Sequence, residues 1–361
     1  MTEQFFKNRL KVVELASVLA GPAVGMFFAE LGAEVIKIEN KKTGGDMTRF
    51  WKLPTEDSSS PYSAYYASVN WNKKTYLLDL EESEDREQAY ALLQNADIVI
   101  SNYRTKVAEK LGVDYPTLSQ INPALIFAQL NAFDDYSERP AFDVVLQAEA
   151  GFLYMNGEAD GPPVKMPVAL IDVLAAHQLK EGILLALLRR TQTGKGAYVS
   201  TSLFESAVAS LVNQATNWLM ASHIPQRMGT QHPNIAPYGD MYTCSDGKAI
   251  LLAVGTEKQF KNLCQVLDLS EILTQLSFSS NVERVKNRAA LNALLAEKIS
   301  VVDASSLLQK LEAANVPAAA IRNMQEVFEL PAAQSMILEE TMPDGTVSKR
   351  VKTVAFEMDE R

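Results

Sequence analysis

Side chains that commonly bind metals or form disulfides are scarce in this chain of 361 residues, which has two cysteines and three histidines. Cys244 and Cys264 are too few for a disulfide framework, and their separation matches no common zinc pattern. His177, His223 and His232 are too scattered for a histidine-rich metal site. We therefore expect no bound metal and a reducing compartment.

Several familiar catalytic signatures are also missing. The sequence has no Gly-x-Ser-x-Gly motif, and no predicted helix N-terminus or histidine lies beside Cys244 to lower the pKa of its thiol. Gly21 and Gly25 have the wrong spacing for a dinucleotide-binding loop, so a nicotinamide dehydrogenase is only a weak rival. Gly21-Pro22 is explained most simply as the start of a helix, and anion binding at that start is the alternative.

An excess of positive charge and a long apolar run are lacking as well. The chain has 34 Lys and Arg against 44 Asp and Glu, which gives a net charge of −10. This balance argues against nucleic acid or a membrane surface as the main partner, but it does not exclude a phosphorylated ligand in a local basic pocket. The longest uninterrupted apolar stretch, Ile183–Leu188, is too short to span a bilayer, and the polar N-terminus resembles no secretory signal. We expect a cytoplasmic protein.

The first half of the chain alternates strand and helix patterns. Lys11–Leu15 and Glu34–Glu39 are predicted strands, and the helix between them opens at Gly21-Pro22 and ends at Gly32. The alternation continues through a predicted helix at Ser83–Gln94 and strands at 75–80, 97–101 and 125–130. This pattern predicts a mostly parallel sheet flanked by helices. The long polar segment Asn40–Ser60 is expected to be functional or mobile.

The second half begins with a long helix and then changes in character. Asp172–Arg190 is strongly helical and ends at the turn Thr193–Gly196. A strand at 198–201 and a helix at 203–221 follow, and then a connector at 223–240 rich in Pro, Gly and Asn. The rest predicts a hairpin around Asp246-Gly247 and helices at 257–267, 284–298 and 304–315. We interpret this region as a second, smaller α+β unit.

A carboxylate is the remaining candidate for covalent chemistry. Asp172 stands where an apolar run meets the long helix, so it is either a helix N-cap or a partly desolvated nucleophile. His177 is five positions further on, about 140° around the helix, and does not share a face with Asp172. The spacing of these residues does not decide between the two roles of Asp172.

Six segments in order resemble family III CoA-transferases, a group that includes formyl-CoA, carnitine-CoA and 2-methylacyl-CoA enzymes. They include KVVELASVLAGPAVGMFFAELGAEVIKIENKKTGGDMTRFW, NWNKKTYLLDL, RPAFDVVLQAEAG, PVALIDVLAAHQLKEGILLALLRRTQTGKGAYVSTSLFESAV and HPNIAPYGDMYTCSDG, and the match covers most of residues 10–255. The resemblance implies an α/β fold: a Rossmann-like large domain of residues 1–222 and 326–361, a smaller α+β domain of residues 223–325, and an interlocked homodimer.

The same resemblance implies the chemistry. Asp172 would be the nucleophile that attacks an acyl-CoA thioester, giving an aspartyl anhydride and then an aspartyl-CoA thioester that passes CoA to an acceptor carboxylic acid. CoA and acyl-CoA would be substrates, and no cofactor would be bound permanently. The residues expected near CoA are Ser17, Val18, Ala20, Lys73, Asn102, Tyr103 and Lys110. The two lysines would supply charge for the phosphates. Solvated surface roles for Lys73 and Lys110, and a core role for Tyr103, remain alternatives.

Four departures from the family pattern shape the hypotheses. Phe142-Asp143 stands where the racemase branch has a His-Asp pair, which favours transfer over racemisation, because a racemase needs two acid/base groups. His177 replaces a residue that is usually Gly, and neither the Gly-rich loop of the formyl-CoA branch nor a C-terminal Gly-x-His-Thr stretch is found. CoA transfer is therefore the leading hypothesis. A 2-methylacyl-CoA racemase or epimerase, and a CoA-binding protein without catalysis, are the alternatives.

Overall fold

The structure is a computed structural model that describes residues 4–134, 137 and 139–358. The chain divides into two compact units. The first contains the residues up to Phe152, the segment Lys165–Ile224 and the residues from Gln334 onward. The second contains Leu153–Val164 and Pro225–Ala333.

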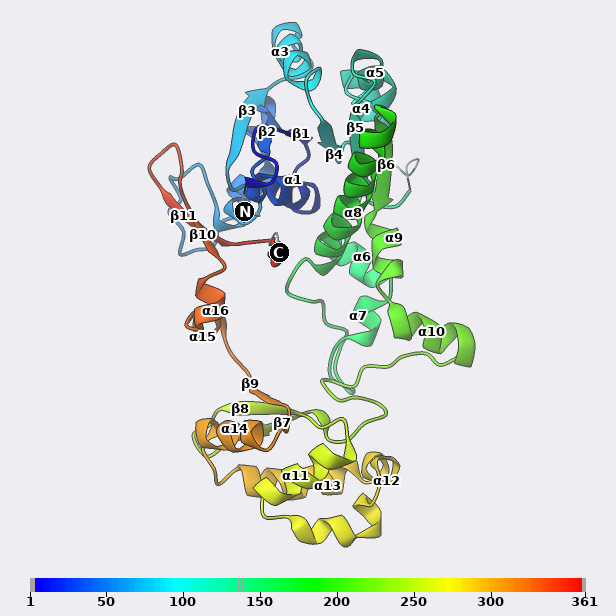
Figure 1. The fold of residues 1–361 in the computed structure, drawn as a ribbon, viewed down its shortest axis with the longest axis vertical. Coiled ribbons are helices and arrows are strands. Elements are labelled where there is room, and N and C mark those ends of the chain that lie inside the picture. Colours follow the sequence, from blue (N-terminus) through cyan, green and yellow to red (C-terminus); the bar gives the residue numbers. More distant parts are fainter. Residues whose placement is uncertain (1–3, 135–136, 138, 359–361) are drawn as a thin grey trace. The chain divides into compact units, whose positions relative to one another are not determined.

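The first unit is built on a six-stranded sheet in the order β3-β2-β1-β4-β5-β6, with every neighbouring pair parallel (Figure 1). The strands are β1 Lys11–Leu15, β2 Glu34–Asn40, β3 Lys73–Leu78, β4 Ile98–Ser101, β5 Ile126–Asn131 and β6 Ala197–Ser202. The parallel sheet predicted from the sequence is thus confirmed. Chain order reverses between β1 and β4, and ligands of such sheets bind at the carboxyl ends of the strands at this point.

Helices cover both faces of this sheet, which explains why its central strands are apolar at consecutive positions. Val12 packs in a core with α1 and α8, while its neighbour Val13 packs in a second core with α3 and α5. The helices of the unit are α1 Ala20–Glu30, α2 Ala64–Ala67, α3 Ser83–Leu93, α4 Thr105–Leu111, α5 Tyr115–Ile121, α6 Asp143–Glu149, α8 Leu170–Thr193, α9 Leu203–Ala209 and α10 Val212–Ala221.

One expectation for this unit is wrong in detail. The helix expected at 203–221 is two helices, α9 and α10, because the Ser206 and Ser210 hydroxyls bond back to carbonyls four residues earlier and Val212 has a φ of 44°. The long polar segment Asn40–Ser60 contains the 3₁₀ helices η2 Lys41–Thr43 and η3 Met47–Phe50. Buried ion pairs hold its first half in place.

The C-terminal residues return to the first unit. They form the antiparallel hairpin β10 Ile337–Thr341 and β11 Val347–Val351, with Asp344-Gly345 in its turn. The buried Glu30 carboxylate on α1 then accepts hydrogen bonds from the backbone N–H groups of Thr353 and Val354 at 2.8 and 2.9 Å. In the part of the chain that the structure describes, no helix is long and apolar enough to cross a membrane.

The second unit is a small α+β fold with its own apolar core. Its antiparallel sheet has the order β7-β8-β9, with β7 Tyr238–Thr243, β8 Ala249–Ala253 and β9 Ala318–Ala320, and the expected hairpin joins the first two. The helix expected at 284–298 is interrupted at Asn287. The helical elements are α7 Phe152–Met155, which starts at the end of the first unit, α11 Glu257–Val266, η4 Ser270–Thr274, η5 Leu276–Phe278, α12 Asn281–Lys286, α13 Arg288–Ile299, α14 Ala304–Ala313, α15 Met324–Phe328 and α16 Pro331–Gln334.

Candidate active site

A cavity of about 400 Å³ opens at the carboxyl ends of the strands of the first unit, beside the β1/β4 reversal. The loops that follow β1, β4 and β5 line it, together with the first residue of α9 and the first turn of α8. The polar or charged residues among these include Ser17, Asn102, Arg104, Asn131, Arg139, Asp143 and Asp172. The position agrees with the rule for ligand sites in open parallel sheets.

Asp172 combines burial with a lack of stabilising donors. It lies in the first turn of α8 with 7% of its surface exposed. Among the described residues, none donates a hydrogen bond to its carboxylate. Burial, reinforced by the negative charge of Asp143, raises the pKa of Asp172 to about 7. The anion is therefore available at neutral pH but is poorly solvated.

Asp143, not Asp172, satisfies the start of α8, so the interpretation of Asp172 as an N-cap is wrong. The Asp143 Oδ1 atom accepts hydrogen bonds from the backbone N–H groups of Ile171 at 2.7 Å and Asp172 at 3.3 Å. The Gln147 amide donates to the other carboxylate oxygen of Asp143. Asp143 thereby holds the first turn of α8 in place and leaves the Asp172 side chain free of a capping role.

The loop after β1 brings three predicted residues to the same cavity. Asn102 holds this loop, because its side chain accepts from the Ser17 N–H at 3.2 Å and donates to the Ser17 carbonyl at 3.0 Å. Val18 follows with a φ of 75°, and Ala20 begins α1. Ser17, Val18, Ala20 and Asn102 all line the cavity that contains Asp172.

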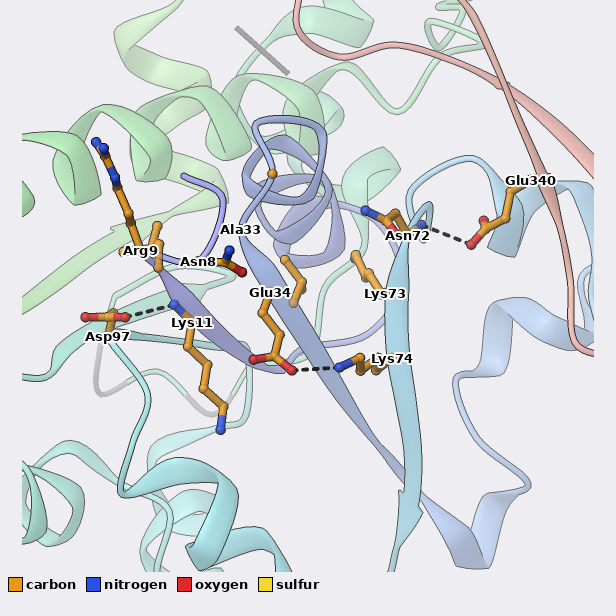
Figure 2. A pocket seen from close by; sticks show the side chains of 13 residues that line it. Asn8, Arg9, Lys11, Ala33, Glu34, Asn72, Lys73, Lys74, Asp97 and Glu340 are labelled. Carbon is orange, nitrogen blue, oxygen red and sulfur yellow. Dashed lines mark hydrogen bonds and ion pairs between the residues drawn. The ribbon is translucent and has the colours of Figure 1, made fainter. Parts of the chain in front are cut away.

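Lys73 lies elsewhere, at the start of β3. Figure 2 shows it beside Lys74 in a polar pocket at the amino ends of β1, β2 and β3. Its ammonium group donates to Glu14 Oε2 at 2.7 Å, to the Pro22 carbonyl at 2.8 Å and to Asn70 Oδ1 at 3.0 Å. Burial lowers the pKa of Lys73 to about 8. All three ammonium hydrogens are thus directed at acceptors of the protein itself.

Tyr103 and Lys110 also lie outside the lining of the cavity. Tyr103 packs against the core on the α3 and α5 side of the sheet, and burial raises the pKa of its phenol. Lys110 is exposed in the last turn of α4 and forms an ion pair with Glu81. Arg104, an exposed cation that lines the cavity, was not predicted from the sequence. Arg104 directly follows Asn102 and Tyr103 at the carboxyl end of a predicted strand, and this position could have indicated that it lies near the site.

Aromatic side chains neighbour the carboxylates. Phe142, which is 53% exposed, lines the cavity, and its ring lies 6.3 Å from that of Trp51. The Trp51 ring in turn meets Tyr65 edge-to-face at 5.0 Å. Burial and the charges of Asp172 and Asp143 raise the pKa of Tyr65 to about 12, so its phenol stays protonated at neutral pH. Among the described residues, no histidine lines the cavity beside these aromatic and carboxylate side chains.

The other residues considered for chemistry are placed unfavourably. Cys264 is buried in the core of the second unit, and burial raises the pKa of its thiol to about 12. His177 is exposed on α8, outside the lining of the cavity. Within the described ranges, no group of three or more His, Cys, Asp or Glu side chains is arranged to hold a metal ion.

Comparison with known proteins gives the family. The sequence profile of "CoA-transferase family III" matches residues 8–361. A succinate–glutarate CoA-transferase of Agrobacterium fabrum is 34% identical over 95% of this chain and 87% of its own. A succinyl-CoA:mesaconate CoA-transferase of Haloarcula marismortui is 32% identical over 89% of this chain and 82% of its own. A crystal structure of a CaiB/BaiF family protein from Brucella suis superposes with a TM-score of 0.86 at 36% identity, covering 97% of this chain and 92% of its own. The chain therefore belongs to CoA-transferase family III.

Proposed function

We propose that the protein transfers CoA from an acyl-CoA thioester to a free carboxylic acid, with Asp172 as the covalent nucleophile. The observation that carries this proposal is a buried carboxylate without hydrogen-bond donors, set in a cavity at the strand ends. A carboxylate deprived of solvation is more reactive toward a carbonyl carbon than one in water. Membership of a CoA-transferase family supports the same reaction.

Transfer proceeds through balanced steps on Asp172. The carboxylate attacks the thioester carbonyl, the CoA thiolate leaves, and a mixed anhydride remains on Asp172. The thiolate attacks the aspartyl carbonyl of this anhydride, which releases the donor acid and leaves an aspartyl-CoA thioester. The acceptor carboxylate attacks this thioester, and the expelled thiolate then attacks the acceptor carbonyl, releasing the new acyl-CoA and the Asp172 carboxylate. Each step exchanges one acyl bond for another of comparable energy.

We propose that CoA binds along the loops after β1 and β4. Ser17, Val18, Ala20 and Asn102 form the wall beside Asp172. Arg104 and Lys110 provide cations for the CoA phosphates, since both are exposed. Arg104→Ala should weaken CoA binding about tenfold, the loss expected for one charge-assisted contact, as measured by calorimetry.

Both acids are proposed to be dicarboxylic acids. The names of the two relatives refer to succinate, glutarate and mesaconate, all of which carry a second carboxylate. Arg139, whose guanidinium pairs with Glu149, lines the cavity together with Arg104, so a second carboxylate has cationic partners nearby. Monocarboxylic acceptors such as butyrate should be poorer substrates than glutarate.

A homodimer is part of the proposal. On α8 the exposed apolar side chains include Leu185 and Leu188, and on α10 they include Leu219 and Met220, which are 78% and 84% exposed. Such apolar faces are typical of surfaces covered by another chain. We propose that a second copy covers them in an interlocked dimer.

A transfer assay tests the reaction. Purified protein is supplied with succinyl-CoA and glutarate, and glutaryl-CoA is followed by chromatography, with Asp172→Asn as the control. We expect glutaryl-CoA from the wild type and at least a thousandfold less from the variant. Exchange of the α-hydrogen of a 2-methylacyl-CoA for deuterium without an acceptor acid would favour the racemase instead. CoA binding without turnover of any donor would favour the non-catalytic alternative.

A further inference from the structure

The backbone of Val18 is in an unusual conformation at the wall of the active-site cavity. Its φ of 75° lies in the left-handed region, which β-branched residues rarely occupy. A residue held in such a region persists only when its surroundings enforce it. The enforcing contact here is Asp46, whose two carboxylate oxygens lie 3.2 and 3.4 Å from the Val18 nitrogen and accept its N–H.

Asp46 is itself held firmly. It is 3% exposed and lies just before the 3₁₀ helix η3. Its Oδ1 atom accepts from the Thr48 N–H at 3.0 Å and from the Thr48 hydroxyl at 2.9 Å, and its own N–H donates to Glu39 at 2.8 Å. Lys37 pairs with its Oδ2 atom at 3.1 Å. These contacts leave the carboxylate one orientation, which is directed at the β1–α1 loop.

The Lys37–Asp46 ion pair belongs to a larger buried cluster of charged side chains next to the β1–α1 loop. The Lys37 ammonium group is fully buried and also bonds Glu14 Oε1 at 2.8 Å and the Ala16 carbonyl at 2.6 Å. Lys73 bonds the other oxygen of Glu14 at 2.7 Å. Two buried cations therefore balance two buried anions, Glu14 and Asp46. The cluster contacts the chain at Ala16 and Val18, on both sides of Ser17.

We propose that Asp46 is a positioning residue of the acyl-CoA site, which holds Val18 in its left-handed conformation and thereby shapes the cavity wall facing Asp172. Lys37 orients Asp46, and Lys73 acts one step further back through Glu14. The inference rests on the proposed function, because it assigns these residues to the wall against which CoA binds. It assigns Lys73 an indirect role in place of a direct contact with a CoA phosphate.

The arrangement is poorly explained by stability alone. Buried ion pairs are weak contributors to stability, because desolvation offsets their attraction, and apolar side chains of similar size often serve as well. A glycine at position 18 would adopt this φ without strain. The combination of a strained valine and a buried carboxylate is instead suited to fixing a single loop geometry.

The test compares Asp46→Ala and Asp46→Asn with a control, Glu30→Gln, which alters a buried carboxylate at the far end of α1 that bonds Thr353 and Val354 and not the β1–α1 loop. The first readout is hydrogen exchange of the peptide covering residues 15–21, which requires no ligand. We expect exchange there to become at least tenfold faster in Asp46→Ala, less so in Asp46→Asn, which keeps one acceptor, and not at all in Glu30→Gln. Unchanged exchange in Asp46→Ala would overturn the inference, whatever the activity of the wild type.

The second readout is the dissociation constant of CoA, measured by calorimetry. Asp46→Ala should raise it at least tenfold when residue 18 is Val, but less than threefold in a Val18→Gly background, because glycine does not need the contact. An equal loss in both backgrounds, or an equal loss in Glu30→Gln, would mean that Asp46 is merely structural. If the wild type transfers no CoA from an acyl-CoA to an acid, the proposed function is contradicted. The hydrogen-exchange experiment would still decide whether Asp46 positions the β1–α1 loop.

Discussion

Asp172 is the proposed nucleophile of the site, and the residues around it set the pKa and the position of its carboxylate. Burial raises its pKa to about 7, and Asp143 adds to this effect through its charge. At the same time, Asp143 caps the helix that carries Asp172. The Asp143 carboxylate thus positions the proposed nucleophile and also makes the proton of Asp172 harder to remove.

Activity should depend on pH through Asp172. Only the ionised carboxylate attacks a thioester, so kcat/KM should fall as the pH decreases through about 7. Asp143→Asn removes the nearby negative charge, and the pKa of Asp172 should then decrease. The acidic limb of the pH–rate profile should move to lower pH in this variant. A limb that does not move, or that moves upward, would contradict the assigned influence of Asp143.

The same raised pKa predicts a cost in stability. Ionised Asp172 is less favourable in the folded than in the unfolded chain, so its contribution to stability is lost as the pH rises from about 4 through about 7. Asp172→Asn should therefore raise the free energy of unfolding at pH 8 by up to about 4 kcal/mol and change it little at pH 4. Urea denaturation at the two pH values measures this. An equal change in the free energy of unfolding at pH 4 and pH 8 would exclude burial of the Asp172 charge as its cause.

For the residues of the candidate site, the sequence indicated which side chains take part better than where each side chain lies. Asp172, Asn102 and the Ser17–Ala20 segment line one cavity, while their catalytic and CoA-binding roles stay predictions. Lys73 follows the family pattern in sequence, yet its ammonium group is directed inward to Glu14, a contact that residue spacing does not reveal. Asp143 was considered only for racemisation, because residue spacing does not reveal its hydrogen bonds to the first turn of α8, 28 and 29 residues further along the chain.

The elements that position the site follow from simple patterns. The six strands of the parallel sheet were predicted within two residues, because buried parallel strands are apolar at consecutive positions. The break between α9 and α10 was missed, since it depends on serine hydroxyls that compete for backbone carbonyls rather than on hydrophobic spacing. The long helix α8 was predicted correctly and ends at a glycine.

Gly194 should be required at the end of α8 for its backbone conformation alone. Its φ is 68°, and a side chain added there would meet nothing within 4 Å. Gly194→Ala should therefore cost about 1 kcal/mol of stability, without any clash. Gly255→Ala is a control, because that glycine is not left-handed and an added side chain would meet only Gln259 Oε1, at an ordinary contact distance of 3.8 Å. Thermal denaturation that shows equal losses in both variants would contradict this explanation.

On the scale of the whole molecule, strand order and assembly lie beyond periodicity. The order β3-β2-β1-β4-β5-β6 places the loops after β1 and β4 next to each other, although 85 residues separate Ser17 from Asn102. Hydrophobic patterns give each strand but not its neighbours, so the resemblance to a family was needed to predict the arrangement. The domain boundaries at 222/223 and 325/326 stay a prediction.

The proposed homodimer can be tested at its apolar surface. Leu219→Asp on α10 replaces a side chain that is 78% exposed in the single chain, so it should leave the folding of the chain unchanged. If a second copy covers this face, the buried charge should weaken association. Light scattering should show a dimer for the wild type and a lighter species for the variant. A monomeric wild type would contradict the proposal.

The most direct test of the central claim is to trap the acyl intermediate on Asp172. The protein is incubated with succinyl-CoA, hydroxylamine is added, and the peptide containing Asp172 is examined by mass spectrometry. We expect a hydroxamate at Asp172 that forms only when succinyl-CoA is present and is absent from Asp172→Asn. An unmodified Asp172 peptide from protein that turns over succinyl-CoA would contradict covalent catalysis by this residue.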